Sequence, residues 1–188
     1  YKKIFRNARE KWYCTINNMN LMIKDRDKTW KYFRDHLITH SAAHYLMALH
    51  ELLEEQGYAR LSDVAKKLDV SLGSLSTSMK PLLKKKLILQ DNNKHLLLSQ
   101  DAKEIALHIE ETWSILTHLF HDILGIDKKS AEIDACKIEH LISPESSEGL
   151  MRLIKVLEKE DKIRKKIRGK GVYVRSPSRS KRSSLESA

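Results

Sequence analysis

Residues 60–98 constrain the fold more than any other stretch, because they read as two short helices followed by a hairpin. The periodicity of apolar residues predicts a first helix near 62–68 and a second from 71 to about 86. A short connection between two such helices is typical of a helix-turn-helix. Two short apolar runs, 87–90 and 95–98, then flank a polar turn, which indicates a β-hairpin. This order of elements predicts a winged helix.

The second helix of this unit has a polar side that suits DNA. Small hydroxyl side chains and a lysine at the start of such a helix can contact phosphates and base edges in a major groove. Pro81 should kink the helix, but only beyond its first two turns. A winged helix that contacts protein instead of DNA is the alternative. The candidate DNA-binding residues are Ser71, Gly73, Ser74, Thr77, Ser78 and Lys80 on the helix, with Asn93 and Lys94 in the hairpin turn.

The remaining sequence reads as helical, so the expected fold class is mainly α. Long runs rich in Leu, Ile, Lys and Glu and the small number of glycines (6) and prolines (3) support this class. Helices with extensive apolar surface after a winged helix commonly form a dimer interface. The expected helices, with their capping residues, are 41–56 (Ser41), the short helix from 62 (Ser62), 99–124 (Ser99), 128–142, and 144–166 (Ser143).

Charge and composition divide the chain into four parts. A basic and aromatic extension is expected at 1–39, the winged helix at 40–98, a helical domain at 99–167, and a disordered basic tail at 168–188. The net charge of +10 comes from the two ends and the winged helix, whereas the helical domain is acidic. A basic module beside an acidic one suits a DNA-contacting half joined to a half that binds cations or a partner. Solvated faces without a function remain the alternative.

The stretch 134–144 carries three side chains that can ligate a metal. Read as helix, Cys136, Glu139 and His140 are spaced i, i+3 and i+4, so they share one face. A thiol, a carboxylate and an imidazole together begin a transition-metal site, and a fourth ligand should come from another element. The alternative is that Cys136 is a core residue and His140 a helix-end imidazole.

Several function classes are not expected. The two cysteines, Cys14 and Cys136, offer no disulfide framework and favour a reducing, cytoplasmic setting. No apolar run approaches the ~18 residues that a membrane-spanning helix needs. An enzyme is not expected either, since no nucleophile–base pair or phosphate-binding loop is found.

Three segments, 54–65, 124–127 and 135–143, carry a resemblance to the DtxR/MntR family of metal-dependent transcriptional repressors. The similarity extends from about Ser41 to Leu157. It implies a winged helix followed by an all-helical metal-binding and dimerisation domain. It also implies that the helix at 41–56 donates a ligand, His44, to a site completed by the Cys136, Glu139 and His140 face.

The chain departs from the family pattern at further ligand positions. Met47 stands where the manganese branch has an acid, and Trp113 and Thr117 stand at positions of a histidine and a carboxylate. His118 or His121 could replace the lost imidazole, although neither is at the matching position. At most one competent site is therefore expected, formed by His44, Cys136, Glu139 and His140. This mixed donor set favours Fe(II), with Zn(II) and Mn(II) as alternatives.

The resemblance implies a function as well. A homodimer would bind a palindromic operator in double-stranded DNA and repress genes of metal-ion homeostasis. Metal would join the helix at 41–56 to the one at 128–142 and set the spacing of the two recognition helices. The alternatives are a metal-independent winged-helix regulator and a protein-interaction module of the same ancestry.

Overall fold

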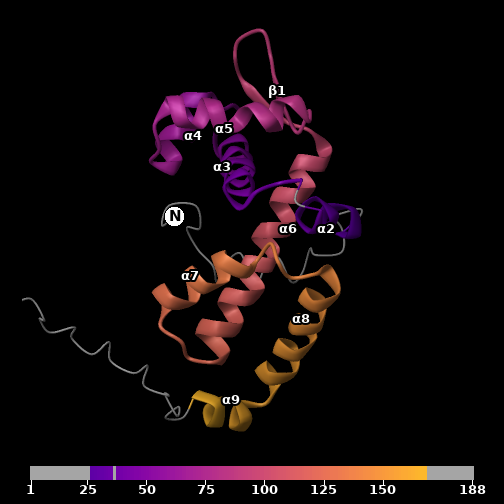
Figure 1. The fold of residues 1–188 in the computed structure, drawn as a ribbon. Helices are drawn as coiled ribbons and strands as arrows, with labels where there is room; N and C mark the ends of the chain where they lie inside the picture. The colour runs from indigo at the N-terminus through magenta and orange to yellow at the C-terminus, as the bar shows by residue number, and fades with distance from the viewer. Residues whose placement is uncertain (1–25, 36, 169–188) are drawn as a thin grey trace, which may run out of the picture.

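The computed structural model describes residues 26–35 and 37–168, and almost all of this part is helical (Figure 1). One small two-stranded sheet is the exception. The elements are α2 (Arg26–Arg34), α3 (His40–Gln56), α4 (Leu61–Leu68), α5 (Leu72–Lys84), β1 (Ile88–Gln90), β2 (Leu96–Leu98), α6 (Gln100–Thr117), the π-helix η1 (His118–Ile123), α7 (Lys128–Ile138), α8 (Pro144–Lys159) and α9 (Asp161–Arg168).

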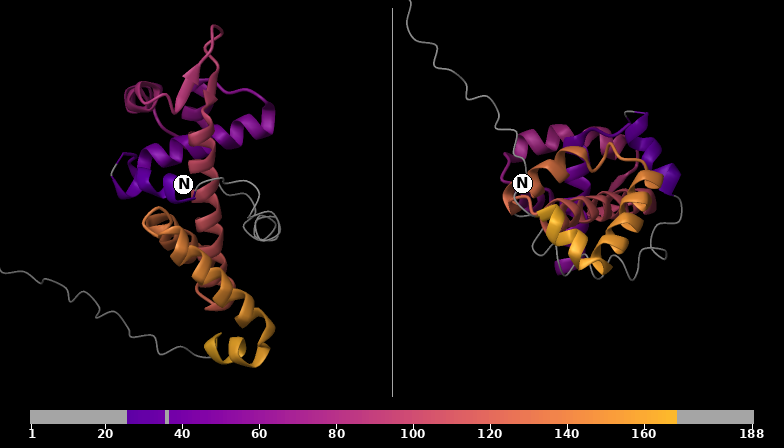
Figure 2. Two further views of the ribbon diagram at one scale, coloured as in Figure 1. Left: turned by 90° about the vertical axis from the view of Figure 1, so that its right-hand side faces the viewer. Right: turned by 90° about the horizontal axis from the view of Figure 1, so that it is seen from below.

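Helix α6 is the central helix of the described structure and contributes residues to the hydrophobic cores at both of its ends. It runs from the hairpin at one end to η1 at the other (Figure 1 and Figure 2). Ile105 and Ile109, in its first half, are buried with α3, α4, α5 and the two strands. Ile115 and Trp113, in its second half, are buried with residues of η1, α7 and α8. The winged helix therefore shares one continuous helix with a second helical layer, which consists of η1, α7 and α8.

The winged helix has the expected form. Helices α4 and α5 follow one another with a tight connection, and β1 pairs antiparallel with β2 in the register Ile88↔Leu98. The backbone N–H of Leu96 donates to the carbonyl of Ala59 at 2.7 Å, which ties the hairpin to the segment before α4. The predicted fold class, a winged helix-turn-helix followed by helices, is confirmed.

Of the four expected capping residues, Ser99 and Ser143 cap their helices and two do not, while Ser71 is a cap that was not predicted. Ser71, Ser99 and Ser143 accept a hydrogen bond from the backbone three residues on. The prediction that Ser41 caps the helix at 41–56 is wrong, because Thr39 caps α3 and the helix begins one residue earlier. The prediction that Ser62 caps the next helix, α4, is also wrong. There Arg60 is the N-cap residue, and its backbone N–H donates to the Asp63 carboxylate at 2.8 Å.

Three expected helices end earlier than their apolar pattern suggested. The α-helix predicted at 99–124 ends at Thr117 and continues as η1. The helix predicted to reach 142 ends at Ile138, although Glu139 keeps right-handed helical dihedrals (φ −51°, ψ −38°). The helix predicted at 144–166 is broken at Glu160, whose φ and ψ of −110° and 72° lie outside the helical region.

Helix α2 forms most of the described part of the expected extension at 1–39, and it packs on α6. Its Arg26 guanidinium forms two hydrogen bonds with the Glu111 carboxylate, at 2.6 and 2.9 Å. Lys28 and Tyr32 both donate to Asp101, near the start of α6. The other predictions for the extension, Cys14 included, and the disordered tail beyond Arg168 lie outside the described residues. None of the helices in the described ranges is both long and apolar enough to cross a bilayer.

Candidate metal centre and DNA-binding face

Helix α3 contributes two histidines to one cluster. His40 and His44 are one helical turn apart, so both imidazoles leave the same side of the helix. Their Nε2 atoms are 3.0 Å apart, and the rings meet edge to face with centroids 4.4 Å apart. His44 is buried and His40 is half-buried.

The end of α7 brings three more donors to these histidines. The Cys136 Sγ lies 3.4 Å from the Nε2 of His44. The Nδ1 of His140 lies 3.3 Å from the Nδ1 of His40. Glu139, at the C-terminus of α7, also faces the cluster and is only 1% exposed. The first turns of α3 and the last turn of α7 thus approach each other beside α6 (Figure 1).

The five donors form two groups that could each hold a metal ion. One group is His40, His44 and Cys136, the other is His40, Glu139 and His140, and within each the donor atoms lie within 4.8 Å of one another. Metal–nitrogen bonds of about 2.1 Å and a metal–sulfur bond of about 2.3 Å place the donors of a tetrahedral ion roughly 3.3–3.6 Å apart. The measured separations of 3.0, 3.3 and 3.4 Å are close to that range.

The three imidazoles are held neutral, which is the form that binds metal. Burial, followed by the neighbouring His40 and His140, lowers the pKa of His44 to about 4. Burial also lowers the pKa values of His40 and His140. The imidazoles therefore present lone pairs at neutral pH and do not repel a cation.

Glu139 and Cys136 show that the cluster fits a cation. Burial raises the pKa of Glu139 to about 9, and its Oε2 is buried without a hydrogen-bond partner among the described residues. Burial, followed by the nearby Glu139, raises the pKa of Cys136 to about 11. Their ionised forms, a buried carboxylate and a half-buried thiolate, are unfavourable here unless a positive ion joins them. The donor set, two to three imidazoles with a thiolate and a carboxylate, suits Fe(II), Co(II) or Zn(II).

The structure brings the four predicted ligands, His44, Cys136, Glu139 and His140, into this one cluster. Their role as ligands stays a prediction. His40 is the residue that sequence reasoning missed as a ligand. Its spacing of four residues from His44 was the available signal.

The positions at which the chain departs from the family pattern lie in the core. Met47 and Trp113 are buried among apolar residues. Thr117 is also buried, and its hydroxyl has no hydrogen-bond partner among the described residues. His118 bonds to the carboxylates of Asp122 and Glu158, and His121 to the carbonyl of Ile126. Neither of these two histidines belongs to the metal-ligand groups of the described residues.

The candidate DNA-binding residues are exposed or half-exposed on α5 and on the hairpin. The six candidates on α5 or at its N-cap are exposed, apart from the half-exposed Ser78, and Asn93 and Lys94 are exposed at the tip of the hairpin. A Cβ added to Gly73 would meet nothing within 4 Å, so the backbone of α5 is open to a ligand there. Val70 and Leu72, which the sequence reasoning did not select, are 39% and 51% exposed beside Ser71. Such apolar side chains can contact thymine methyl groups.

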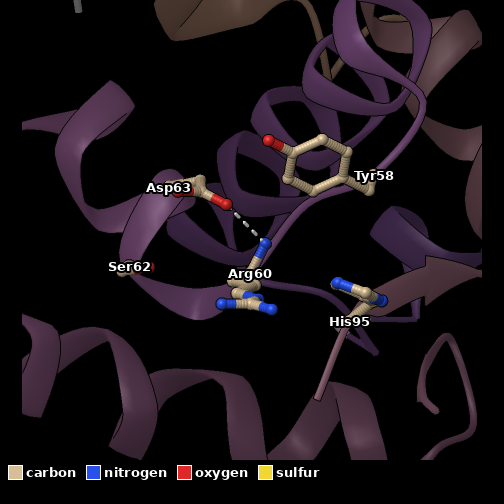
Figure 3. Close-up of a pocket in the computed structure, with 5 residues that line it drawn as sticks. All are labelled: Tyr58, Arg60, Ser62, Asp63 and His95. Atoms are coloured by element: carbon tan, nitrogen blue, oxygen red, sulfur yellow. Dashed lines mark hydrogen bonds between the residues drawn. The ribbon is translucent and has the colours of Figure 1, made fainter. Parts of the chain in front are cut away.

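A pocket of about 440 Å³ lies between the start of α4 and the hairpin (Figure 3). It is lined by Tyr58, Arg60, Ser62, Asp63 and His95. The Tyr58 and His95 rings lie 5.8 Å apart, while the Arg60 side chain projects into the open space between α4 and β2. The lining is part polar and part apolar, and it carries the negative charge of Asp63 as well as the positive charge of Arg60, whose guanidinium is the group that can bind a phosphate.

Comparison with known proteins gives consistent matches. The family described as "Iron dependent repressor, metal binding and dimerisation domain" matches residues 99–168. The HTH-type transcriptional regulator MntR of Bacillus velezensis is 30% identical over 130 residues, which cover 69% of this chain and 90% of that protein. MntR of Bacillus subtilis is 28% identical over 132 residues, covering 70% of this chain and 92% of the relative.

Solved structures support the same fold. The crystal structure of IdeR from T. acidophilum superposes with a TM-score of 0.52 at 20% identity, over 60% of this chain and 53% of that chain. This chain therefore spans about half the length of that IdeR. A hypothetical protein from Sulfolobus solfataricus, SSo2273, gives a TM-score of 0.51 at 18% identity, over 62% of this chain and 89% of the other.

Proposed function

This chain belongs to the DtxR/MntR family of metal-dependent transcriptional repressors, and we propose that it represses transcription when a divalent transition metal binds between α3 and α7. One observation carries this proposal: histidines of α3 and donors at the end of α7 meet at 3.3–3.4 Å. The proposed ligands are His44, Cys136, Glu139 and His140, with His40 added.

The metal would act by fixing one helix relative to another. Helix α3 lies in the core of the winged helix, and α7 packs on the second half of α6. Ligands on both helices would therefore hold the DNA-binding unit at one angle to the second helical layer. The metal supplies the positive charge that the Glu139 carboxylate and the Cys136 thiolate need in order to ionise there.

The chain would bind double-stranded DNA as a homodimer. Helix α5 is exposed along its hydroxyl-rich side and would enter the major groove, with the hairpin tip at the backbone. Residues 99–168, the range that matches a metal-binding and dimerisation domain, would supply the dimer contact. A palindromic operator follows from two-fold symmetry. Genes of metal-ion homeostasis are the proposed targets.

The choice of metal follows from the donors. The thiol of Cys136 and the imidazoles favour Fe(II), Zn(II) or Co(II), while Mn(II) prefers oxygen ligands. We propose Fe(II) as the regulatory ion, since it accepts nitrogen, oxygen and sulfur donors together.

The test is fluorescence anisotropy on a pool of labelled genomic fragments, with and without Fe(II) or Mn(II). Wild type is compared with the double variant Glu139→Ala/His140→Ala. Metal-enhanced binding that the double variant lacks supports the proposal. Equal binding in all four conditions would overturn metal regulation, and the absence of salt-dependent DNA binding would overturn the DNA-binding role.

A further inference from the structure

His95 is held at the end of the hairpin turn by the carboxylate of Asp91. The Oδ1 of Asp91 accepts hydrogen bonds from the backbone N–H groups of Asn93, at 2.9 Å, and of His95, at 2.8 Å. Its Oδ2 lies 3.1 Å from the Nδ1 of the His95 ring. A carboxylate oxygen only accepts hydrogen bonds, so Nδ1 is the ring nitrogen that carries the hydrogen. In the neutral imidazole the other nitrogen, Nε2, is then an acceptor.

Asp91 is kept ionised by this arrangement. The hydrogen bond from the backbone N–H of His95 lowers the pKa of Asp91 most, and those from the His95 ring and the Asn93 N–H lower it further. The turn therefore holds a negative charge against one edge of the His95 ring. His95 itself is half-buried, and its Nε2 has no hydrogen-bond partner among the described residues.

The His95 ring also lines the pocket of about 440 Å³ between the start of α4 and the hairpin (Figure 3). The same pocket is lined by Arg60, the N-cap residue of α4, and by Ser62 in the first turn of that helix. The Tyr58 ring lies 5.8 Å from the His95 ring. A guanidinium, a hydroxyl and the N-terminus of a helix are groups that bind phosphate. Because Asp91 holds Nδ1, Nε2 is the nitrogen that His95 can offer to a ligand in the pocket.

The charges beside His95 do not favour an anion while its ring is neutral. Arg60 is positive, whereas Asp63 in the first turn of α4 is negative and accepts the backbone N–H of Arg60 at 2.8 Å. Asp91 adds a second negative charge in the turn. The lone pair of a neutral Nε2 also repels a phosphate oxygen. Protonation of His95 changes both conditions, because Nε2–H then donates and the ring carries a positive charge that Asp91 pairs with.

We propose that this pocket binds one phosphate of the DNA backbone through Arg60 and the Nε2–H of His95, and that His95 takes up a proton when the phosphate binds. The proton comes from water, and no covalent bond to the phosphate is made. Asn93 and Lys94, exposed at the tip of the same hairpin, lie next to this contact. The inference rests on the proposed DNA binding and deepens it, because it names a residue through which pH controls the contact of the hairpin.

The test measures DNA affinity against pH by fluorescence anisotropy, with the metal-free full chain, a random-sequence duplex and a fixed salt concentration. An excess of chelator keeps metal binding out of the comparison. Phosphodiesters stay ionised from about pH 6 to about pH 8, so a change in affinity reports groups of the protein. Wild type should bind more tightly as the pH falls, by up to about 10-fold per pH unit, the limit for one proton. Isothermal titration in buffers of different ionisation enthalpy should show uptake of up to about one proton per protomer.

Two substitutions of His95 separate its ring nitrogens. Glutamine places an amide nitrogen near the position of Nε2, so His95→Gln should lose the pH dependence and keep at least the wild-type affinity at about pH 8. Asparagine places its amide near the position of Nδ1, so His95→Asn can still bond to Asp91 but does not reach the phosphate. It should lose the pH dependence and bind about 10-fold more weakly than wild type at about pH 6. The control is His121→Asn in η1, which can still donate to the Ile126 carbonyl and should behave as wild type.

Equal wild-type affinity at both pH values would overturn the role of His95, and so would an undiminished pH dependence in His95→Gln. Loss of the pH dependence in His121→Asn would also contradict the assignment to His95. This inference and the proposed function fail separately. DNA binding that depends on salt but not on pH contradicts only the proton-linked contact, and operator binding that metal leaves unchanged contradicts only metal regulation. Absence of DNA binding at every pH would contradict both.

Discussion

At the scale of single residues, Glu139 is the proposed ligand whose protonation should change most when metal binds. Its side chain is almost completely buried, and one of its oxygens has no hydrogen-bond partner among the described residues. Burial raises its pKa to about 9, so at pH 7 it carries a proton unless a cation is present. A protonated carboxyl can be buried in the metal-free fold, and a bound metal ion would favour its ionised form.

Replacement of Glu139 by glutamine tests this directly. Glutamine matches the neutral carboxyl in shape, so Glu139→Gln should change the melting temperature of the metal-free protein by no more than roughly 4 °C. The rise in melting temperature on adding Zn(II) or Fe(II) should shrink clearly, because a neutral amide is a weak ligand. Calorimetry of both proteins with and without metal measures this. A full metal-induced rise in the variant would exclude Glu139 as a ligand.

The pH dependence of metal affinity follows from the same groups. Glu139 and Cys136 are protonated below pKa values of about 9 and about 11, so metal must displace both protons. The imidazoles add little to the pH dependence of metal affinity above pH 7, because their lowered pKa values leave them unprotonated there. Affinity should therefore rise with pH, by up to about 100-fold per pH unit between pH 7 and 8.5. Competition titrations with a chelator would measure the slope, and Glu139→Gln should make it shallower.

We expect Arg60, which lies beside the hairpin, to contact a DNA phosphate when the winged helix binds DNA. Its guanidinium projects into the polar pocket between α4 and β2 (Figure 3). If it contacts one phosphate, Arg60→Gln should weaken binding to all sequences alike and reduce the slope of log K against log salt by about 1. Anisotropy titrations at several salt concentrations measure the slope. Lys66→Gln, on the same short helix, is the comparison, and an equal change in it would point to net charge alone.

At the scale of elements, the parts of the fold that could be predicted are those whose signals lie within a short stretch of sequence. The apolar repeat of α5 and the two runs around an Asx-rich turn are contained within forty residues, so the winged helix followed from sequence. The break of the last helix at Glu160 has no local signal such as proline or glycine. The change from α6 to the π-helix η1 is not marked by a proline or glycine either.

The candidate metal centre was predictable only in part. Cys136, Glu139 and His140 share one short stretch, so their grouping could be seen in the sequence. His40 meets His140 across a hundred residues of separation, and that contact depends on how α3 and α7 pack against α6. Periodicity within one helix contains no information about such packing.

Helix α2 gives a prediction about stability. The Arg26–Glu111 pair is largely buried, with side-chain exposures of 15% and 6%. Burial raises the pKa of Glu111, and the Arg26 guanidinium opposes that rise. Arg26→Met should leave a buried carboxylate without a partner and cost about 3 kcal/mol in the free energy of unfolding at pH 7.

The sign of the pH effect on this variant is also determined. Without Arg26 the pKa of Glu111 rises further, so the carboxyl takes up a proton as the pH falls and the uncompensated charge disappears. The destabilisation by Arg26→Met should therefore be smaller at pH 5 than at pH 7. Urea unfolding at both pH values checks this. Arg34→Met, which removes an exposed pair with Asp35, should have little effect at either pH.

At the scale of the whole molecule, the candidate metal centre lies between two helices that pack on different parts of α6. Helix α3 packs on the first part of α6, and α7 packs on its second part. The donors of both helices meet beside α6, so a bound ion would add a connection between α3 and α7 that packing alone does not provide. The ion would thereby restrict the angle between the winged helix and the second helical layer.

This geometry predicts that metal and DNA bind cooperatively. If metal selects the arrangement that fits the operator, it should raise operator affinity about 10-fold or more, within the range of typical allosteric coupling. Because coupling is reciprocal, operator should raise metal affinity by the same factor. Isothermal titration of metal into the protein with and without operator, beside anisotropy with and without metal, gives both factors. Glu139→Gln should reduce both, whereas an operator affinity that metal leaves unchanged would show that the link between α3 and α7 does not control the DNA-binding face.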